Sequence, residues 1–266
     1  MKKLIRNFIL NYPSLNYQLK KMAGRPDFIE LALSSYFRVN RTRDLFFIQI
    51  GANNGINHDP LNKFINKYKP GGILIEPVPH LFEQLKKNYA HRKGLLFENV
   101  AIGNPGQKLT FYRVKSDKNK FYDQLGSFDL NTILRQKKNI PGLENLLVEE
   151  PVMVISFDDL VKKHTIKTCD VLMMDTEGYD AEIIKLIDLS KTSFDLVIYE
   201  SKHLNEDDKG YCLSKFRSQG YKTYATVSDT LCVNKKLDNL IKRLERQTPR
   251  FASMSNPKPI HLTVTL

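Results

Sequence analysis

The sequence of 266 residues is poor in cysteine and contains no long apolar run. Its three cysteines, Cys169, Cys212 and Cys232, are widely spaced and form no C-x-x-C pair. This spacing excludes a disulfide framework and a cysteine-based zinc site, and it indicates buried thiols in a reducing compartment. No stretch approaches the roughly 18 consecutive apolar residues of a transmembrane helix. Polar residues interrupt the segment after Lys2 and Lys3, so we expect no signal peptide either.

The net charge of +12 comes from 41 Lys and Arg residues against 29 Asp and Glu residues, and such an excess suggests an anionic partner. Residues 1–43 hold nine basic and two acidic residues, and residues 235–266 hold seven and two. Residues 44–234 hold 25 of each and are neutral. We therefore expect a basic helical N-terminal segment over 1–43, a functional domain over 44–234 and a basic C-terminal tail over 235–266.

These features predict a cytoplasmic protein. Weak association of the basic flanks with an anionic membrane surface is an alternative that the sequence leaves open. The sequence does not indicate an oligomeric state.

Apolar runs alternate with amphipathic segments along the domain, which predicts an α/β fold with a mostly parallel sheet and helices on both faces. The expected strands are 45–50, 72–76, 95–100, 170–175, 194–200, 221–227 and 230–234. The expected helices are 60–68, 80–90, 180–187 and 206–218, with two further helical pieces within 14–37.

Residues 104–155 separate the two halves of this pattern. Residues 108–114 alternate like an exposed strand, whereas 115–150 are polar and are predicted to form a loop-like insertion. Such an insertion serves as a lid or a substrate-binding element, and a solvated surface excursion is the equal alternative.

A glycine turn follows the first predicted strand as Gly51-Ala52-Asn53-Asn54-Gly55. Glycines at this place let the backbone turn sharply and let a ligand approach it closely. The spacing is neither the dinucleotide fingerprint G-x-G-x-x-G nor a P-loop, and a plain tight turn is the structural alternative.

Glu76 ends the second predicted strand, 25 residues after Gly51, and Pro77 follows it. An acid at this place can accept hydrogen bonds from both hydroxyls of a ribose. Together with the glycine turn, it predicts a nucleoside-containing ligand at the switch point of the sheet.

Three acids lie at the end of the fourth predicted strand: Asp175, Glu177 and Asp180. They can meet a cationic ligand, orient a hydroxyl, accept its proton or hold a divalent ion, and capping of the next helix is the structural alternative. His203 follows the fifth strand and is a candidate general base, although a single loop histidine is more often structural.

These motifs together resemble the FkbM family of S-adenosylmethionine-dependent methyltransferases, and the resemblance covers about residues 45–234. It implies a class I methyltransferase fold, with a seven-stranded sheet whose last strand is antiparallel. The segments that carry it are FIQIGANNG (47–55), GILIEPVPHLFEQLKKNY (72–89), FENVAIGN (97–104), VISFDDL (154–160), DVLMMDTEGYDAEII (170–184), VIYESKHL (197–204) and the closing GYKTYATVSDTLCV.

The resemblance also implies a set of cofactor contacts for S-adenosylmethionine. The methionine and ribose side would be lined by Gly51, Ala52, Asn53 and Gly55, with Asp175 near the transferred methyl group. Glu76 would hold the ribose hydroxyls, with Pro77 beside the adenosine. The adenine would face Asn99, Val100 and Ala101.

One position departs from many class I enzymes, which carry an acid two residues before the first glycine of the turn. Here that residue is Gln49, which can still accept a hydrogen bond.

The activity implied by the resemblance is O-methylation of a hydroxyl on a sugar, glycan or natural product. A hydroxyl acceptor benefits from a general base, and the candidates are Asp175, Glu177, His203 and Asp59. The sequence assigns no metal site, and it leaves open whether a divalent cation is an additional cofactor. Aromatic residues of the insertion can stack on a sugar ring or form a local core: Tyr112, Phe121, Tyr122 and Phe128.

Three other functions are alternatives to O-methylation of a small molecule or glycan. A nucleic-acid methyltransferase would use the basic flanks, but the neutral domain and the lack of an RNA-binding motif make nucleic acid an unexpected partner. A non-catalytic nucleoside-binding module would not need the acids of DTEGYD. An NAD-dependent dehydrogenase would need the missing glycine pattern.

Overall fold

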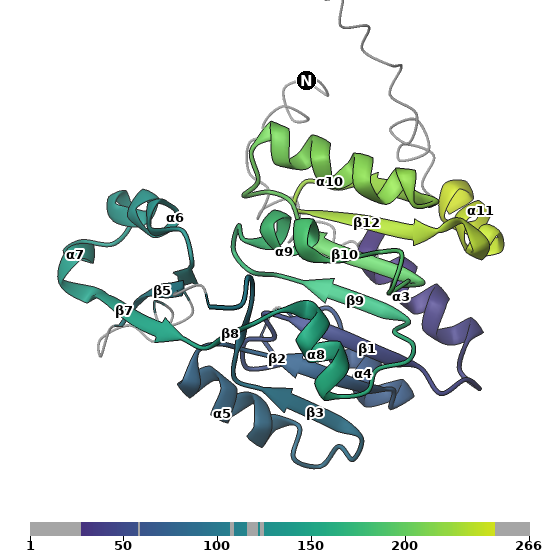
Figure 1. Cartoon of the computed structure of the whole chain (residues 1–266), viewed down its shortest axis with the longest axis horizontal. Helices are drawn as coiled ribbons and strands as arrows, with labels where there is room; N and C mark the ends of the chain where they lie inside the picture. Colours follow the sequence, from purple (N-terminus) through teal and green to yellow (C-terminus); the bar gives the residue numbers. More distant parts are fainter. Residues whose placement is uncertain (1–27, 58, 107–108, 116–121, 123–124, 248–266) are drawn as a thin grey trace, which may run out of the picture.

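The computed structural model describes residues 28–57, 59–106, 109–115, 122 and 125–247. Its main sheet has seven strands in the order β11-β12-β10-β9-β1-β2-β3 (Figure 1). Every strand is parallel to the others except β12, which pairs antiparallel with β10 and β11. The strands are β1 (Phe46–Ile50), β2 (Gly71–Ile75), β3 (Leu95–Glu98), β9 (Val171–Met174), β10 (Leu196–Glu200), β11 (Tyr221–Ala225) and β12 (Asp229–Asn234). The predicted fold class is confirmed, including the antiparallel last strand.

Helices cover both faces of the main sheet, which explains why its strands are continuous apolar runs. Successive strand residues enter opposite cores: Phe47 packs with one set of helices and Ile48 with the other. The first set is α3 (Phe28–Val39), α4 (Asn62–Tyr68), α5 (Pro79–Asn88) and α11 (Asp238–Gln247). The second set is α8 (Phe157–Lys163), α9 (Asp180–Leu186) and α10 (Glu206–Ser218). The first helical piece expected within 14–37 lies outside the described residues.

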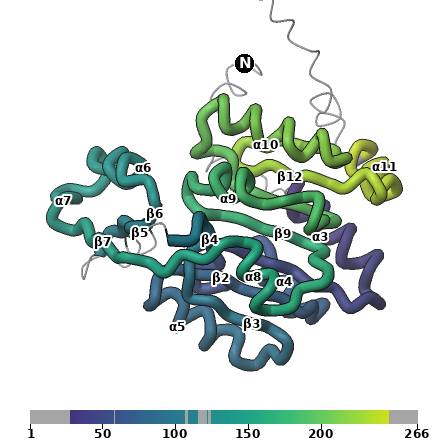
Figure 2. The backbone as a smooth tube through the Cα atoms, in the orientation of Figure 1, coloured from purple at the N-terminus to yellow at the C-terminus, as the bar shows by residue number. Residues whose placement is uncertain are grey.

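The prediction that 115–150 is loop-like is wrong for the part of this segment that the structure describes. It contributes to a lobe with a three-stranded antiparallel sheet in the order β6-β5-β7, which lies to the left of the main sheet in Figure 2. The lobe has its own small core of Val114, Ile133, Ile140 and Leu143. Its elements are β5 (Leu109–Val114), β6 (Gly126–Ser127), α6 (Leu130–Leu134), the 3₁₀ helix η2 (Arg135–Lys138), α7 (Leu143–Leu146) and β7 (Leu147–Val152).

The lobe is joined to the main domain by a short parallel pair, β4 (Ala101–Ile102) with β8 (Val154–Ile155). The strand expected over 95–100 therefore ends at Glu98, and the chain resumes as β4 after two residues. This pair fixes the lobe next to the carboxyl ends of β1, β2 and β3.

Two other expectations concern the cysteines and membrane spans. The three cysteines are free and buried, as predicted. None of the helices in the described ranges is long and apolar enough to cross a membrane.

The described parts of both basic flanks contact two buried acids at the start of β9 and β10. Tyr36 of α3 donates a hydrogen bond to Asp195 at 2.5 Å, and Arg43 pairs with Asp170 at 2.8 Å. From the other flank, Lys236 of the 3₁₀ helix η3 (Lys235–Leu237) pairs with Asp195 at 2.5 Å. Part of the basic excess therefore neutralises acids of the domain itself.

We expect Tyr36→Phe to lower the free energy of unfolding by about 1–2 kcal/mol, because it removes a buried donor to Asp195. Urea denaturation measures the change. The control Tyr211→Phe alters a tyrosine that is 44% exposed and should cost less than about 0.5 kcal/mol. Equal stability of Tyr36→Phe and the unsubstituted protein would contradict this role.

Candidate functional site

A cavity of about 360 Å³ opens at the carboxyl ends of the parallel strands, between the main sheet and the lobe. Ten of the thirteen residues predicted from the sequence line it: Gly51, Ala52, Asn53, Asp59, Glu76, Pro77, Val100, Ala101, Asp175 and Glu177. The other three, Gly55, Asn99 and His203, lie outside its wall. A site at this edge is typical of open α/β sheets.

Gly55 and Asn99 do not line the cavity, but they hold in place the segments that do. A side chain at Gly55 would collide with Tyr89 and Leu85, so the glycine permits close packing of the turn on α5. The Asn99 amide donates hydrogen bonds to the Glu76 and Pro77 carbonyl oxygens at 2.8 and 3.1 Å, which holds the β2 loop in place.

The turn after β1 is held against the loop after β9. Gly51 has φ +79°, and a Cβ atom there would lie 1.9 Å from the Asp175 carbonyl oxygen. Asn53 also has a positive φ of 50°. Gly51 therefore lines the cavity at a position where a side chain would collide with the loop after β9.

Glu76 is buried at the end of β2 with its carboxylate facing the turn. The Asn53 amide donates to Oε2 at 2.7 Å and the Val78 amide donates to Oε1 at 2.9 Å. Burial raises the pKa of Glu76 to about 7, although both hydrogen bonds act in the opposite direction. Each oxygen keeps a further lone pair for a ligand hydroxyl.

Gln49 and Asp59 form a polar pair on the cavity wall. The Gln49 amide donates to Asp59 Oδ1 at 3.1 Å, and the Leu61 backbone amide donates to the same oxygen at 2.8 Å. Burial raises the pKa of Asp59 to about 6. The buried Oε1 of Gln49 has no hydrogen-bond partner among the described residues. An unpaired acceptor beside a carboxylate suits a cationic ligand group.

Asp175 opens onto the cavity and accepts no hydrogen bond from the described residues. Partial desolvation by the surrounding protein, followed by the charges of Glu200, Glu177 and Asp180, raises the pKa of Asp175 well above its usual range. Asp180 lies behind it and accepts hydrogen bonds from the backbone amide and hydroxyl of Thr176 at 3.2 and 2.6 Å. Asp180 therefore orders the loop, whereas Asp175 can contact a ligand.

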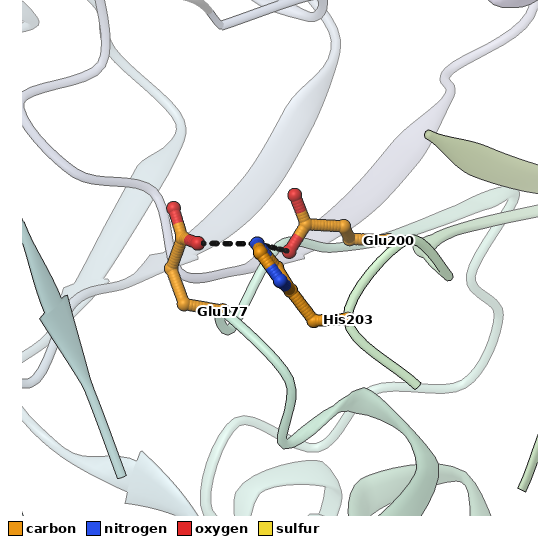
Figure 3. A group of neighbouring side chains, drawn as sticks. All are labelled: Glu177, Glu200 and His203. Carbon is orange, nitrogen blue, oxygen red and sulfur yellow. Dashed lines mark ion pairs between the residues drawn. The ribbon is translucent and has the colours of Figure 1, made fainter. Parts of the chain in front are cut away.

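Glu177 is positioned by both the main domain and the lobe. Its φ is +52°, and the Ser127 hydroxyl of β6 donates to its carbonyl oxygen at 2.9 Å. Its Oε2 lies 3.2 Å from Nε2 of His203, which in turn lies 3.7 Å from Oε2 of Glu200 (Figure 3). Burial alone would raise the pKa of Glu177, but the His203 hydrogen bond and the Lys202 charge hold it below its usual value.

The lobe contributes an aromatic and basic wall, of which the sequence analysis named Phe128 and missed Phe111 and Arg113. Phe111 and Arg113 of β5 line the cavity together with Phe128. The Phe111 and Phe128 rings meet edge to face with centroids 5.1 Å apart. The period-two alternation of this strand was the signal that could have identified Phe111 and Arg113.

Of the four aromatic residues proposed to stack on a sugar, Phe128 lines the cavity. Tyr112 and Tyr122 pack against the lobe core. Phe121 lies outside the described residues.

Comparison with known families gives one match. Residues 49–223 match the family model described as the methyltransferase FkbM domain. A search of curated proteins gave no match.

Solved methyltransferase structures are similar to the chain at low identity. A methyltransferase FkbM from Methylobacillus flagellatus KT is 15% identical with a TM-score of 0.41, covering 71% of this chain and 43% of its own. The chain thus spans less than half of that protein. A precorrin-6y C5,15-methyltransferase from Geobacter metallireducens GS-15 is 11% identical with a TM-score of 0.38 (77% and 87% coverage). The N-terminal domain of human METTL16 is 12% identical with a TM-score of 0.42 (76% and 66%).

The turn geometry predicts that Gly51→Ala destabilises the protein more than Gly220→Ala does. Both glycines have φ near +80°, but a Cβ atom at Gly220 meets nothing within 4 Å. Gly220→Ala should therefore lower the free energy of unfolding by about 1 kcal/mol, from backbone strain alone. Gly51→Ala should lower it by about 3 kcal/mol or more. Urea denaturation compares the two variants, and equal costs would refute the close approach of Gly51 to Asp175.

Proposed function

The chain belongs to the methyltransferase FkbM domain family, and from this premise we propose that it transfers the methyl group of S-adenosylmethionine to a hydroxyl of a sugar, glycan or natural product. The observation that carries the proposal is the buried Glu76 carboxylate, held by two backbone amides at the wall of the cavity. An acceptor-only group at the end of the second strand is suited to the two hydroxyls of a ribose.

The other residues of the wall fit the remaining parts of such a cofactor. The unpaired Gln49 Oε1 and the Asp59 carboxylate can accept hydrogen bonds from its ammonium group. Asp59 supplies the negative charge that Gln49 lacks, so we assign Asp59 to cofactor binding rather than to proton transfer. Val100 and Ala101 offer an apolar surface for the adenine.

When bound, the cofactor supplies an electrophilic methyl group carried on a sulfonium. The protein has to orient the acceptor hydroxyl toward that methyl group and exclude water. The lobe supports both tasks because its residues Phe111 and Phe128 line the cavity together with the acids Asp175 and Glu177. Aromatic faces of this kind suit the apolar C–H face of a sugar ring.

We propose Asp175 as the general base among the four candidates. It lines the cavity, opens onto it and accepts no hydrogen bond from the described residues. Glu177 is engaged with His203, and His203 lies outside the cavity wall. In this role Asp175 accepts the hydrogen bond of the acceptor hydroxyl and takes its proton as the oxygen forms its new bond.

The described contacts of the flanks weigh against nucleic acid as the substrate. Arg43 and Lys236 are paired with the acids Asp170 and Asp195 of the domain. The charges of these two residues are therefore compensated within the protein and are not available to a nucleic acid.

The raised pKa of Glu76 predicts that S-adenosylhomocysteine binds more tightly as the pH rises through about 7. Ribose hydroxyls donate to the ionised carboxylate, so affinity should rise up to about tenfold between pH 6 and pH 8. Calorimetry with Glu76→Gln should show weaker binding and lose most of this dependence. Glu98→Gln, at the end of the neighbouring strand and outside the cavity wall, is the control. An unchanged pH profile in Glu76→Gln would remove Glu76 from the site.

Loss of the base predicts a selective effect on turnover. Asp175→Asn should lower the rate of methyl transfer by about 10²–10⁴-fold and change the affinity for S-adenosylhomocysteine by less than about threefold. A screen of glycans and small hydroxyl compounds with radiolabelled methyl donor supplies the acceptor for this measurement. The exposed Asp207→Asn variant of α10 should behave as the unsubstituted protein. Full turnover in Asp175→Asn would rule out Asp175 as the base.

A further inference from the structure

Glu177 of the loop after β9, Glu200 at the end of β10 and His203 of the loop after β10 converge beside the cavity (Figure 3). Each offers one donor atom, and the three atoms lie within 4.8 Å of one another. We propose that these three side chains bind one divalent metal ion.

The spacing of the donor atoms suits a single ion. Metal–ligand bonds of about 2.0–2.2 Å place two ligands of one ion up to roughly 4.4 Å apart. The His203 Nε2 atom lies 3.2 Å from Glu177 Oε2 and 3.7 Å from Glu200 Oε2. Small changes in the side-chain torsions therefore bring all three donors to bonding distance.

Glu200 provides a separate indication that a ligand belongs here. Its side chain is only 4% exposed, and its Oε1 is paired with the Lys202 ammonium group. Its Oε2 points toward His203 and accepts no hydrogen bond among the described residues. A buried carboxylate oxygen without a partner is costly, and a metal ion at this point satisfies it.

The balance of charges at these strand ends also favours a cation. Four carboxyl groups meet here, those of Asp175, Glu177, Asp180 and Glu200. Lys202 is the cation paired with them in the described structure. A divalent ion compensates the acids that one ammonium group leaves unbalanced.

The donor set indicates the class of metal. Two carboxylates and one imidazole combine ligands that suit Mn²⁺ with one that suits Fe²⁺ or Zn²⁺. A first-row divalent ion is therefore a better match than Ca²⁺, which takes oxygen ligands. Because Glu177 also lines the cavity, the ion lies at its wall.

The test is a titration of the full chain, stripped of metal with a chelator, with Mn²⁺ alone. The electron paramagnetic resonance signal of free Mn²⁺ reports how much ion is bound. We expect one Mn²⁺ per chain with a dissociation constant of roughly 100 μM or tighter. The experiment contains no methyl donor or acceptor, so its result does not depend on the proposed methyl transfer.

Variants decide whether the bound ion is in this site. Glu177→Gln and His203→Asn should each weaken Mn²⁺ binding about 100-fold or more, since even outer-shell partners contribute 10–100-fold. Glu177 is 44% exposed, so its substitution leaves the fold intact even if a change at buried Glu200 does not. The matched controls Glu206→Gln and His91→Asn alter exposed residues outside the cluster and should bind as the unsubstituted chain does.

Two results overturn the proposal. The first is a chain that binds no Mn²⁺ in this range, which would leave His203 as a hydrogen-bonding bridge between two carboxyl groups. The second is Mn²⁺ binding that Glu177→Gln and His203→Asn leave unchanged, which would place the ion elsewhere.

Discussion

The parallel pairing of β1 with β2 on one side and with β9 on the other is the constraint on which the site depends. It brings the carboxyl ends of the three strands to one edge of the sheet, at the point where the strand order reverses. Gly51, Glu76 and Asp175 each follow one of these strands, so three residues far apart in the sequence meet around one cavity. The turn at Gly51 has no space for a side chain because it contacts the Asp175 carbonyl oxygen. The pairing of the strands thus brings these lining residues together.

The basic flanks acquire a structural role from the same sheet. Asp170 and Asp195 are buried near the amino ends of β9 and β10, at the edge opposite the cavity. Arg43 and Lys236 bring basic groups from the two flanks to these acids, because a buried carboxylate is stable only when it is paired and hydrogen-bonded. The carboxyl ends of β9 and β10 are different: four acids meet one lysine there. At one edge of the sheet the acids are paired with basic residues of the flanks. At the other edge, which contains the cavity, the acids outnumber the basic groups.

The fold and ten residues of the cavity wall follow from local patterns in the sequence and from the family resemblance. Continuous apolar runs identify the strands because both sheet faces are covered, and Glu76 and Asp175 stand where those runs end. The lobe could not be recognised in this way, since Val114, Ile133, Ile140 and Leu143 form a core without any regular spacing. The pairing of Gln49 in β1 with Asp59 and the approach of Glu177, after β9, to His203, after β10, depend on tertiary contacts. Gly55 belongs to the predicted turn, yet it packs on α5 rather than on the cavity.

We propose that the cavity at the carboxyl edge of the sheet binds S-adenosylmethionine, although the turn after β1 lacks the dinucleotide pattern G-x-G-x-x-G. The most direct measurement is calorimetric titration of the full chain with S-adenosylmethionine and, separately, with NAD. We predict binding of one S-adenosylmethionine per chain and no measurable heat with NAD, because the turn at Gly51 and the loop at Glu76 leave a nucleoside site but no pyrophosphate cradle. Binding of NAD with no response to S-adenosylmethionine would contradict the account.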